Sequence, residues 1–86
     1  DIAEHLETDE DVWEFLAAVL ATGTTSDFIH ALNTAARAKG MTEVAKLAGV
    51  TRASLYKSLS AEGNPRFETI NKIVEALGGR LSVVGQ

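Results

Sequence analysis

The 86-residue chain contains no cysteine, which excludes both disulfides and thiolate metal sites. It also has no apolar run close to the roughly 20 residues that a membrane-spanning helix needs, and no secretory signal is visible. We therefore expect a protein of a reducing cytoplasm that does not act in a membrane. The chain begins at Asp1 without methionine, so we expect a few native N-terminal residues to precede it.

Basic side chains are missing from residues 1–34, which hold eight acids and so carry a charge of −8. Residues 35–60 hold five basic side chains against Glu43 alone, a charge of +4, and residues 61–86 are neutral. Binding to DNA depends on the local surface that meets phosphate, so the basic stretch matters more than the net charge of −4. The acidic N-terminal part is either a separate interaction face or a solubilising surface.

Side chains that carry catalysis or bind metals are also scarce. His5 and His30 are the two histidines, and each lies in a predicted helix near an acid, as is typical of a helix surface. The serines have no base at a fixed spacing. Gly78 and Gly79 lack the preceding strand and following helix of a phosphate-binding loop. We therefore expect no enzymatic activity, no metal ion and no cofactor.

The spacing of apolar residues predicts one all-α domain of five to six helices over residues 1–86. Residues 1–24 are expected to form an acidic N-terminal helical extension, in which residues 8–11 resemble a capping box. Trp13 in this extension is expected in the core or against a partner. The next helix is expected to begin at Thr24 or Thr25, and the last helix is predicted from Phe67 to Leu77.

A short β-branched segment closes the chain. Leu81 and Val83 alternate with Arg80 and Ser82, which predicts a β-strand over residues 80–84. A single strand cannot satisfy its own backbone groups, and the rest of the chain offers no second strand. We therefore expect this strand to pair with another chain, either the same protein in a homodimer or a different protein.

Residues 41–59 have the layout of a helix-turn-helix. Thr42 is expected to cap a first short helix and Thr51 a second, with a tight turn at Gly49 between them. Leu55 and Leu59 are four residues apart, so they share the buried face of the second helix. The joint spacing of these features, and no one of them alone, indicates the motif.

The outer face of the second helix suits the major groove of DNA. Lys57 and Ala53 project opposite the two leucines. Ser54 and Tyr56 lie on the flanks, and Arg52 lies near the exposed N-terminal end. Small, hydroxyl-bearing and basic side chains at these places can reach base edges and phosphates. Tyr56 is expected to contact phosphate or a partner, or to pack partly buried.

The runs GMTEVAKLAGVTRASLYKSL and GNPRFETINKIVEALG resemble the Xre/Cro-type, lambda-repressor-like helix-turn-helix superfamily over residues 27–78. With the acidic N-terminal part, the chain resembles the addiction-module antidote group, related to HigA-like antitoxins. The resemblance implies a lambda-repressor-like fold and autoregulation as a homodimer on double-stranded operator DNA. It also implies neutralisation of a small basic RelE/HigB-like toxin, in a bacterial cytoplasmic protein associated with the nucleoid.

The resemblance also implies DNA contacts. Thr42 and Glu43 fall where the first motif helix meets the phosphate backbone, where an acid at 43 would repel phosphate. Arg52, Ala53 and Lys57 fall where the recognition helix meets bases. The candidate DNA-binding residues are therefore Thr42, Thr51, Arg52, Ala53, Ser54, Tyr56 and Lys57. Two alternatives stay open: a stand-alone phage-like Xre-type regulator without a toxin partner, and a helix-turn-helix protein-interaction adaptor, which the net acidity favours.

Overall fold

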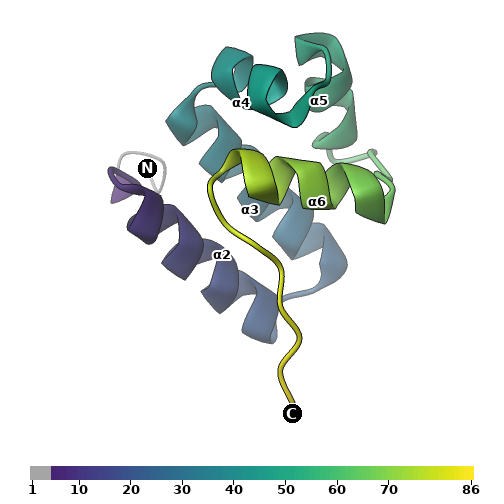
Figure 1. Ribbon diagram of the computed structural model, residues 1–86. Helices are drawn as coiled ribbons and strands as arrows, with labels where there is room; N and C mark the ends of the chain where they lie inside the picture. Colours follow the sequence, from purple (N-terminus) through teal and green to yellow (C-terminus); the bar gives the residue numbers. More distant parts are fainter. Residues whose placement is uncertain (1–4) are drawn as a thin grey trace.

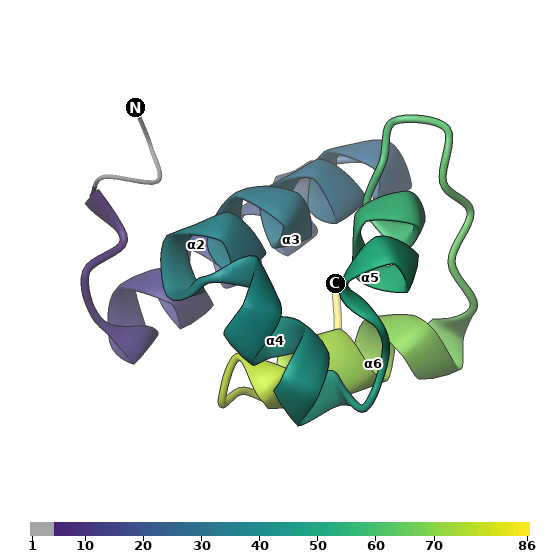
Figure 2. The ribbon, with the colours of Figure 1, turned by 90° about the horizontal axis from the view of Figure 1, so that it is seen from above.

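The computed structural model describes residues 5–86, and every regular element in this range is helical. Five helices follow one another: α2 (Asp9–Thr22), α3 (Thr25–Lys39), α4 (Met41–Ala48), α5 (Arg52–Ser58) and α6 (Phe67–Ala76). Helix α2 packs against α3, and α4 packs against α3, α5 and α6 (Figure 1). Seen from above, α2 and α5 lie on different sides of the molecule (Figure 2). The all-α class is as predicted.

Both long helices begin with a capping box. The Thr8 hydroxyl accepts a hydrogen bond from the Asp11 backbone N–H at 3.1 Å, and the Asp11 carboxylate accepts one from the Thr8 N–H at 3.2 Å. Thr24 and Asp27 make the same reciprocal pair at the start of α3. Each pair satisfies backbone donors that a helix start otherwise leaves open. The predicted starts of both helices are confirmed.

The core lies where the helices cross. Small residues of α3, Ala35 and Ala36, are fully buried there and let neighbouring helices approach closely. Helix α2 adds Val12 and Leu16 to the same cluster, so the acidic helix shares one core with the rest of the chain. The largest fully buried side chains are those of Leu32, Val44, Leu55, Ile73 and Leu77.

Trp13 connects α2 to the end of α6 through a hydrogen bond. Its indole Nε1 donates a hydrogen bond to the Leu77 carbonyl oxygen at 2.9 Å. Gly79 leaves room for the ring, because a Cβ there would lie 3.2 Å from the indole Cδ1 atom. Gly78 adopts a φ of +84°, which L side chains rarely take. Trp13 remains 39% exposed, so it lies at the rim of the core and not inside it.

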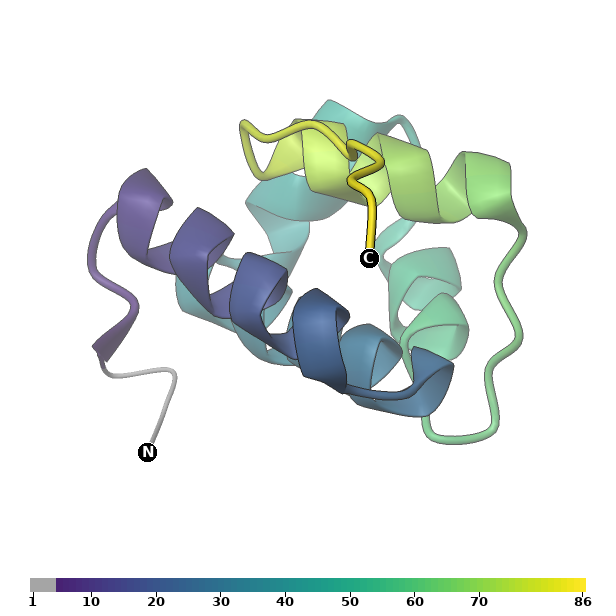
Figure 3. The same ribbon diagram turned by 90° about the horizontal axis from the view of Figure 1, so that it is seen from below.

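The β-strand predicted over residues 80–84 does not form within residues 5–86. The segment runs past α6 and leaves the fold between α2 and α6 (Figure 3). A strand needs a neighbouring strand to bond with, and the described part of the chain offers none. Pairing of this segment with a second chain stays a prediction.

Candidate nucleic-acid interface

Helices α4 and α5 are joined by a tight turn at Gly49. This residue adopts the left-handed conformation, with φ 73° and ψ 29°, which glycine takes without the steric cost of a Cβ. The Val50 backbone N–H then donates to the Ala45 carbonyl oxygen at 3.0 Å and closes the turn. The glycine turn predicted from the sequence is confirmed.

One predicted cap is confirmed and the other is wrong. The Thr51 hydroxyl accepts from the Ser54 backbone N–H at 3.0 Å and caps α5, as predicted. Helix α4 instead begins at Met41, with Gly40 in the capping position and no side-chain cap. The chain passes from α3 into α4 through Gly40 alone, which places Thr42 inside the first turn of α4. The Thr42 hydroxyl is thereby left for a different contact.

The two faces of α5 differ as the sequence predicts. Leu55 and Leu59 are 1% and 4% exposed and face the core. Val50, in the turn before α5, also packs partly buried against that core. The structure brings the seven candidate residues onto α4, the turn and α5, with every one of them exposed to solvent: Thr42, Thr51, Arg52, Ala53, Ser54, Tyr56 and Lys57.

Three of these residues form a cluster, which we call the Arg52 cluster: Arg52, Thr42 and Tyr56. The Arg52 Nη1 atom donates to the Thr42 hydroxyl at 3.0 Å, and Nη2 donates to the Tyr56 hydroxyl at 3.2 Å. The guanidinium carbon also lies 5.5 Å from the Tyr56 ring centroid, within cation–π range. A guanidinium has five N–H donors, so three remain for a ligand. The cluster fixes a positively charged side chain at the start of α5 and connects this side chain to α4 by a hydrogen bond.

The Arg52 cluster differs from what the sequence alone suggests. Arg52 and Tyr56 are four residues apart on one helix, and this i,i+4 spacing was the available signal for their contact. No sequence pattern reports the bond from Arg52 to Thr42, because it joins two helices. Tyr56 is 44% exposed, so the partly buried packing considered for it is not seen.

A second charged surface lies on α2. Glu10 and Glu14 are exposed and one turn apart, and we call this pair the acidic face of α2. Asp11 is engaged in the capping box, and Asp9 lies 3.8 Å from the Lys39 ammonium. The two glutamates are therefore the acids of this helix that are best placed to meet a partner.

Residues 5–86 contain no group of three metal-ligating side chains that could hold an ion. Among the helices of this range, none has the length and apolarity to cross a bilayer.

Comparison with known proteins places the chain in a family. A family model described as "probable addiction module antidote protein" matches residues 1–85. An uncharacterised protein of Haemophilus influenzae is similar to the chain, with 39% identity over 83 residues that cover 96% of this chain and 86% of the relative. No solved structure matches. The chain therefore belongs to the family of probable addiction module antidote proteins.

Proposed function

We propose that the protein is the antitoxin of a type II toxin–antitoxin module and represses its own operon by binding operator DNA. Family membership supports the antitoxin role, because an antidote implies a toxin partner. The observation that carries the DNA-binding role is the Arg52 cluster, an exposed cation held at the start of α5. In this proposal α4 and α5 are a helix-turn-helix of the Xre, lambda-repressor-like type, and α5 is the recognition helix.

The geometry of the Arg52 cluster suits recognition of bases or phosphate. An arginine can give two parallel hydrogen bonds to a guanine edge or to a phosphate. Because two hydroxyls already orient the guanidinium, less side-chain freedom is lost when DNA binds. Lys57 follows Arg52 by five residues, about 7.5 Å along the helix axis, and reaches further along the duplex. The Thr42 hydroxyl can donate its own hydrogen to a phosphate oxygen.

We assign the toxin to the acidic face of α2. Toxins of the RelE/HigB type act on RNA and are expected to present basic surfaces, which Glu10 and Glu14 would attract. Helices α2 and α5 lie on different sides of the molecule, so both partners can bind at once (Figure 2). Operators are usually read by two-fold dimers, so the protein would act as a homodimer in the bacterial cytoplasm, associated with the nucleoid.

Operator binding can be tested by fluorescence anisotropy with the DNA fragment upstream of the gene. Arg52→Ala should weaken binding by about 1–3 kcal/mol, or roughly 5- to 150-fold, if Arg52 reads a base. Lys72→Ala is the matched control, because it also removes one exposed positive charge but lies on α6, where it pairs with Glu68 at 3.2 Å. Equal losses in both variants would contradict a role for α5.

The antitoxin role can be tested by co-expressing the neighbouring small protein. Wild type should rescue growth arrest, and a Glu10→Gln, Glu14→Gln variant should rescue it less. These two substitutions leave the Thr8–Asp11 capping box intact, so α2 should still form. Equal rescue would remove the acidic face from the mechanism. A harmless neighbour would favour the stand-alone regulator, and toxin binding without operator binding would favour the adaptor.

A further inference from the structure

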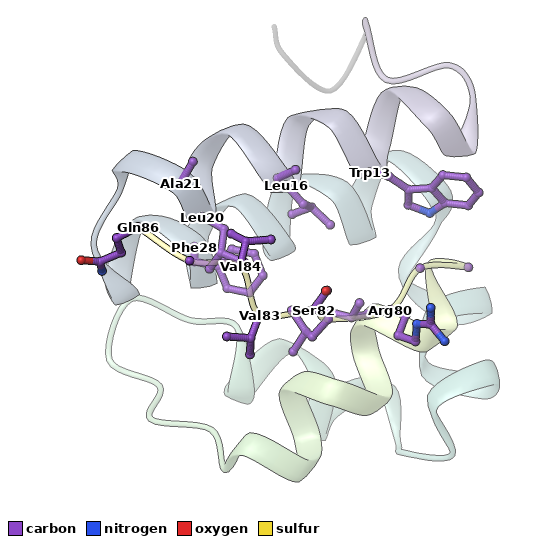
Figure 4. Close-up of a pocket in the computed structure, with 16 residues that line it drawn as sticks. Trp13, Leu16, Leu20, Ala21, Phe28, Arg80, Ser82, Val83, Val84 and Gln86 are labelled. Atoms are coloured by element: carbon purple, nitrogen blue, oxygen red, sulfur yellow. The ribbon is translucent and has the colours of Figure 1, made fainter.

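An open apolar groove lies between α2 and the C-terminal segment, residues 78–86 (Figure 4). Trp13, Leu16 and Leu20 of α2 line one side, and Phe28 of α3 also contributes to the lining. The groove has a volume of about 1210 Å³. It is open to solvent and runs along an extended segment, so a chain segment suits it better than an enclosed small ligand.

The rim of the groove exposes large apolar side chains. Val83 and Val84 are 98% and 82% exposed, and Leu20 is 49% exposed. In Figure 4 Val84 is directed toward α2, whereas Val83 points away from it. Single exposed apolar residues are common, but several around one hollow are typical of an interaction surface.

The backbone of the C-terminal segment is also open to a partner. Its last backbone hydrogen bond to the described chain is from the Gly79 N–H to the Val74 carbonyl oxygen, at 3.1 Å. Beyond this point the segment is neither helical nor paired within residues 5–86. Such an edge pairs readily with an extended segment of another chain.

The charge of the groove bears on which partner fits it. Arg80 is the one charged residue that lines it, and none of its lining residues is acidic. A basic toxin would find no attraction here and would favour the acidic face of α2. Two copies of a chain with a net charge of −4 repel each other, and they repel least where neither presents an acid. The groove therefore suits a second copy of the same chain.

We propose that the α2 groove and the C-terminal segment form the self-association surface of this protein. Two copies pair residues 80–84 in antiparallel fashion about a two-fold axis, so that the paired segment of each lies beside the groove of the other. Such an interface is isologous, so one patch serves both copies. The inference rests on the proposed function in one respect, which is what the dimer is for: the surface would join two operator-binding units.

Sedimentation velocity without DNA or toxin tests the surface directly. The Val83→Glu, Val84→Glu variant should dimerise at least tenfold more weakly than wild type. Both valines are exposed, so its circular dichroism melt should match that of wild type. Phe67→Glu is the matched control, because Phe67 is 72% exposed but lies outside the groove, and it should leave the dimer unchanged. A wild-type monomer at 100 µM protein would overturn the proposal, as would a normal dimer in the double variant.

A single-cysteine scan tests the antiparallel register. The chain has no cysteine, so Ser82→Cys, Val83→Cys and Val84→Cys each introduce one thiol. Antiparallel pairing brings equivalent residues together only near the two-fold axis, so cross-linking under oxidation should peak at one position. Glu62→Cys, in the loop before α6, should not cross-link. A dimer that cross-links nowhere in the scan, or equally at all three sites, would overturn the pairing.

The results separate the two proposals. A dimer that binds no promoter fragment would contradict the operator role and leave the self-association surface standing. A monomer that binds the promoter would overturn the surface alone. A third outcome is that the wild type is a monomer and the Val83→Glu, Val84→Glu variant no longer rescues cells from the toxin. This would assign the groove to the toxin and would also overturn the inference.

Discussion

Arg52 is held in place by contacts within the protein itself. Its guanidinium donates to the Thr42 and Tyr56 hydroxyls and stacks near the Tyr56 ring. A free arginine side chain loses up to about 2 kcal/mol of conformational entropy when it is fixed. In the proposed function, Thr42 is therefore a positioning residue for Arg52, a role that its sequence position did not suggest.

Thr42→Val tests this positioning role. Valine keeps the shape of threonine but removes the acceptor, so operator affinity should fall by about 0.5–1.5 kcal/mol, roughly 2- to 13-fold. Thr42→Ser should restore it. In an Arg52→Ala background the Thr42→Val change should cost less, because only a direct contact of the hydroxyl with phosphate would then remain to be lost. Anisotropy measurements on the four variants give the cycle, and a full additional loss in that background would contradict positioning through Arg52.

At the scale of helices, a threonine stabilises the fold where its side chain caps a helix. Thr24 caps α3 through a reciprocal pair with Asp27, whereas Thr42 caps nothing and lies in the first turn of α4. The same residue type therefore has different energetic roles at two helix starts. Helix α3 packs against both α2 and α4, so a weakened α3 start affects much of the fold.

Thr24→Ala should lower the free energy of unfolding by about 1 kcal/mol, because the Asp27 backbone N–H loses the hydroxyl that accepts its hydrogen bond. Thr42→Ala is the control at an exposed helix start and should change it by less than about 0.5 kcal/mol. Urea unfolding followed by circular dichroism measures both. Equal losses would mean that Thr42 supports α4 after all.

The hydrogen bond of Trp13 leads to a prediction about the stability of the contact between α2 and α6. Trp13→Phe keeps an aromatic ring but removes the donor to the Leu77 carbonyl, and we expect a loss of about 0.5–1.5 kcal/mol. Phe67→Leu changes an exposed aromatic residue of α6 and should be nearly neutral. Urea unfolding again gives the comparison, and an unchanged midpoint for Trp13→Phe would show that the hydrogen bond adds no net stability.

At the scale of the whole molecule, the charges are separated in space as well as along the chain. Glu10 and Glu14 lie on α2, whereas Arg52 and Lys57 lie on α5, on a different side of the fold (Figures 1 and 2). A net acidic protein can therefore present a basic surface on α5, because the acids of α2 lie on another side and are screened by salt; Glu43, exposed on α4 beside Thr42, is the acid that stays close to this surface. The net negative charge is therefore weaker support for the alternative that the protein is a protein-interaction adaptor.

The salt dependence of operator binding tests this separation. Lys57→Ala should make the slope of log affinity against log salt shallower by about 1 if Lys57 meets a phosphate. The Glu10→Gln, Glu14→Gln variant should keep the wild-type slope, because these residues lie on α2, on a different side of the fold from α5. Anisotropy titrations at several KCl concentrations measure both slopes. A slope change in the glutamine variant as large as that of Lys57→Ala would place α2 against the duplex.

Local chemistry determined the parts of the fold that could be read from the sequence. Thr8, Thr24 and Thr51 cap helices because a hydroxyl reaches a backbone N–H three residues ahead. Gly49 ends α4 because it tolerates the left-handed conformation, and Leu55 and Leu59 share a face because the helix repeats every 3.6 residues. All of these interactions join residues within five positions of one another.

Contacts between distant residues were decided by the tertiary structure alone. Thr42 bonds to Arg52 ten residues away, and Trp13 bonds to a carbonyl 64 residues away. The pattern of residues 80–84 favours a strand, but a strand forms only beside another, and none lies within residues 5–86. Sequence periodicity reports which face of an element is apolar, whereas which groups meet across elements depends on how the helices pack in space.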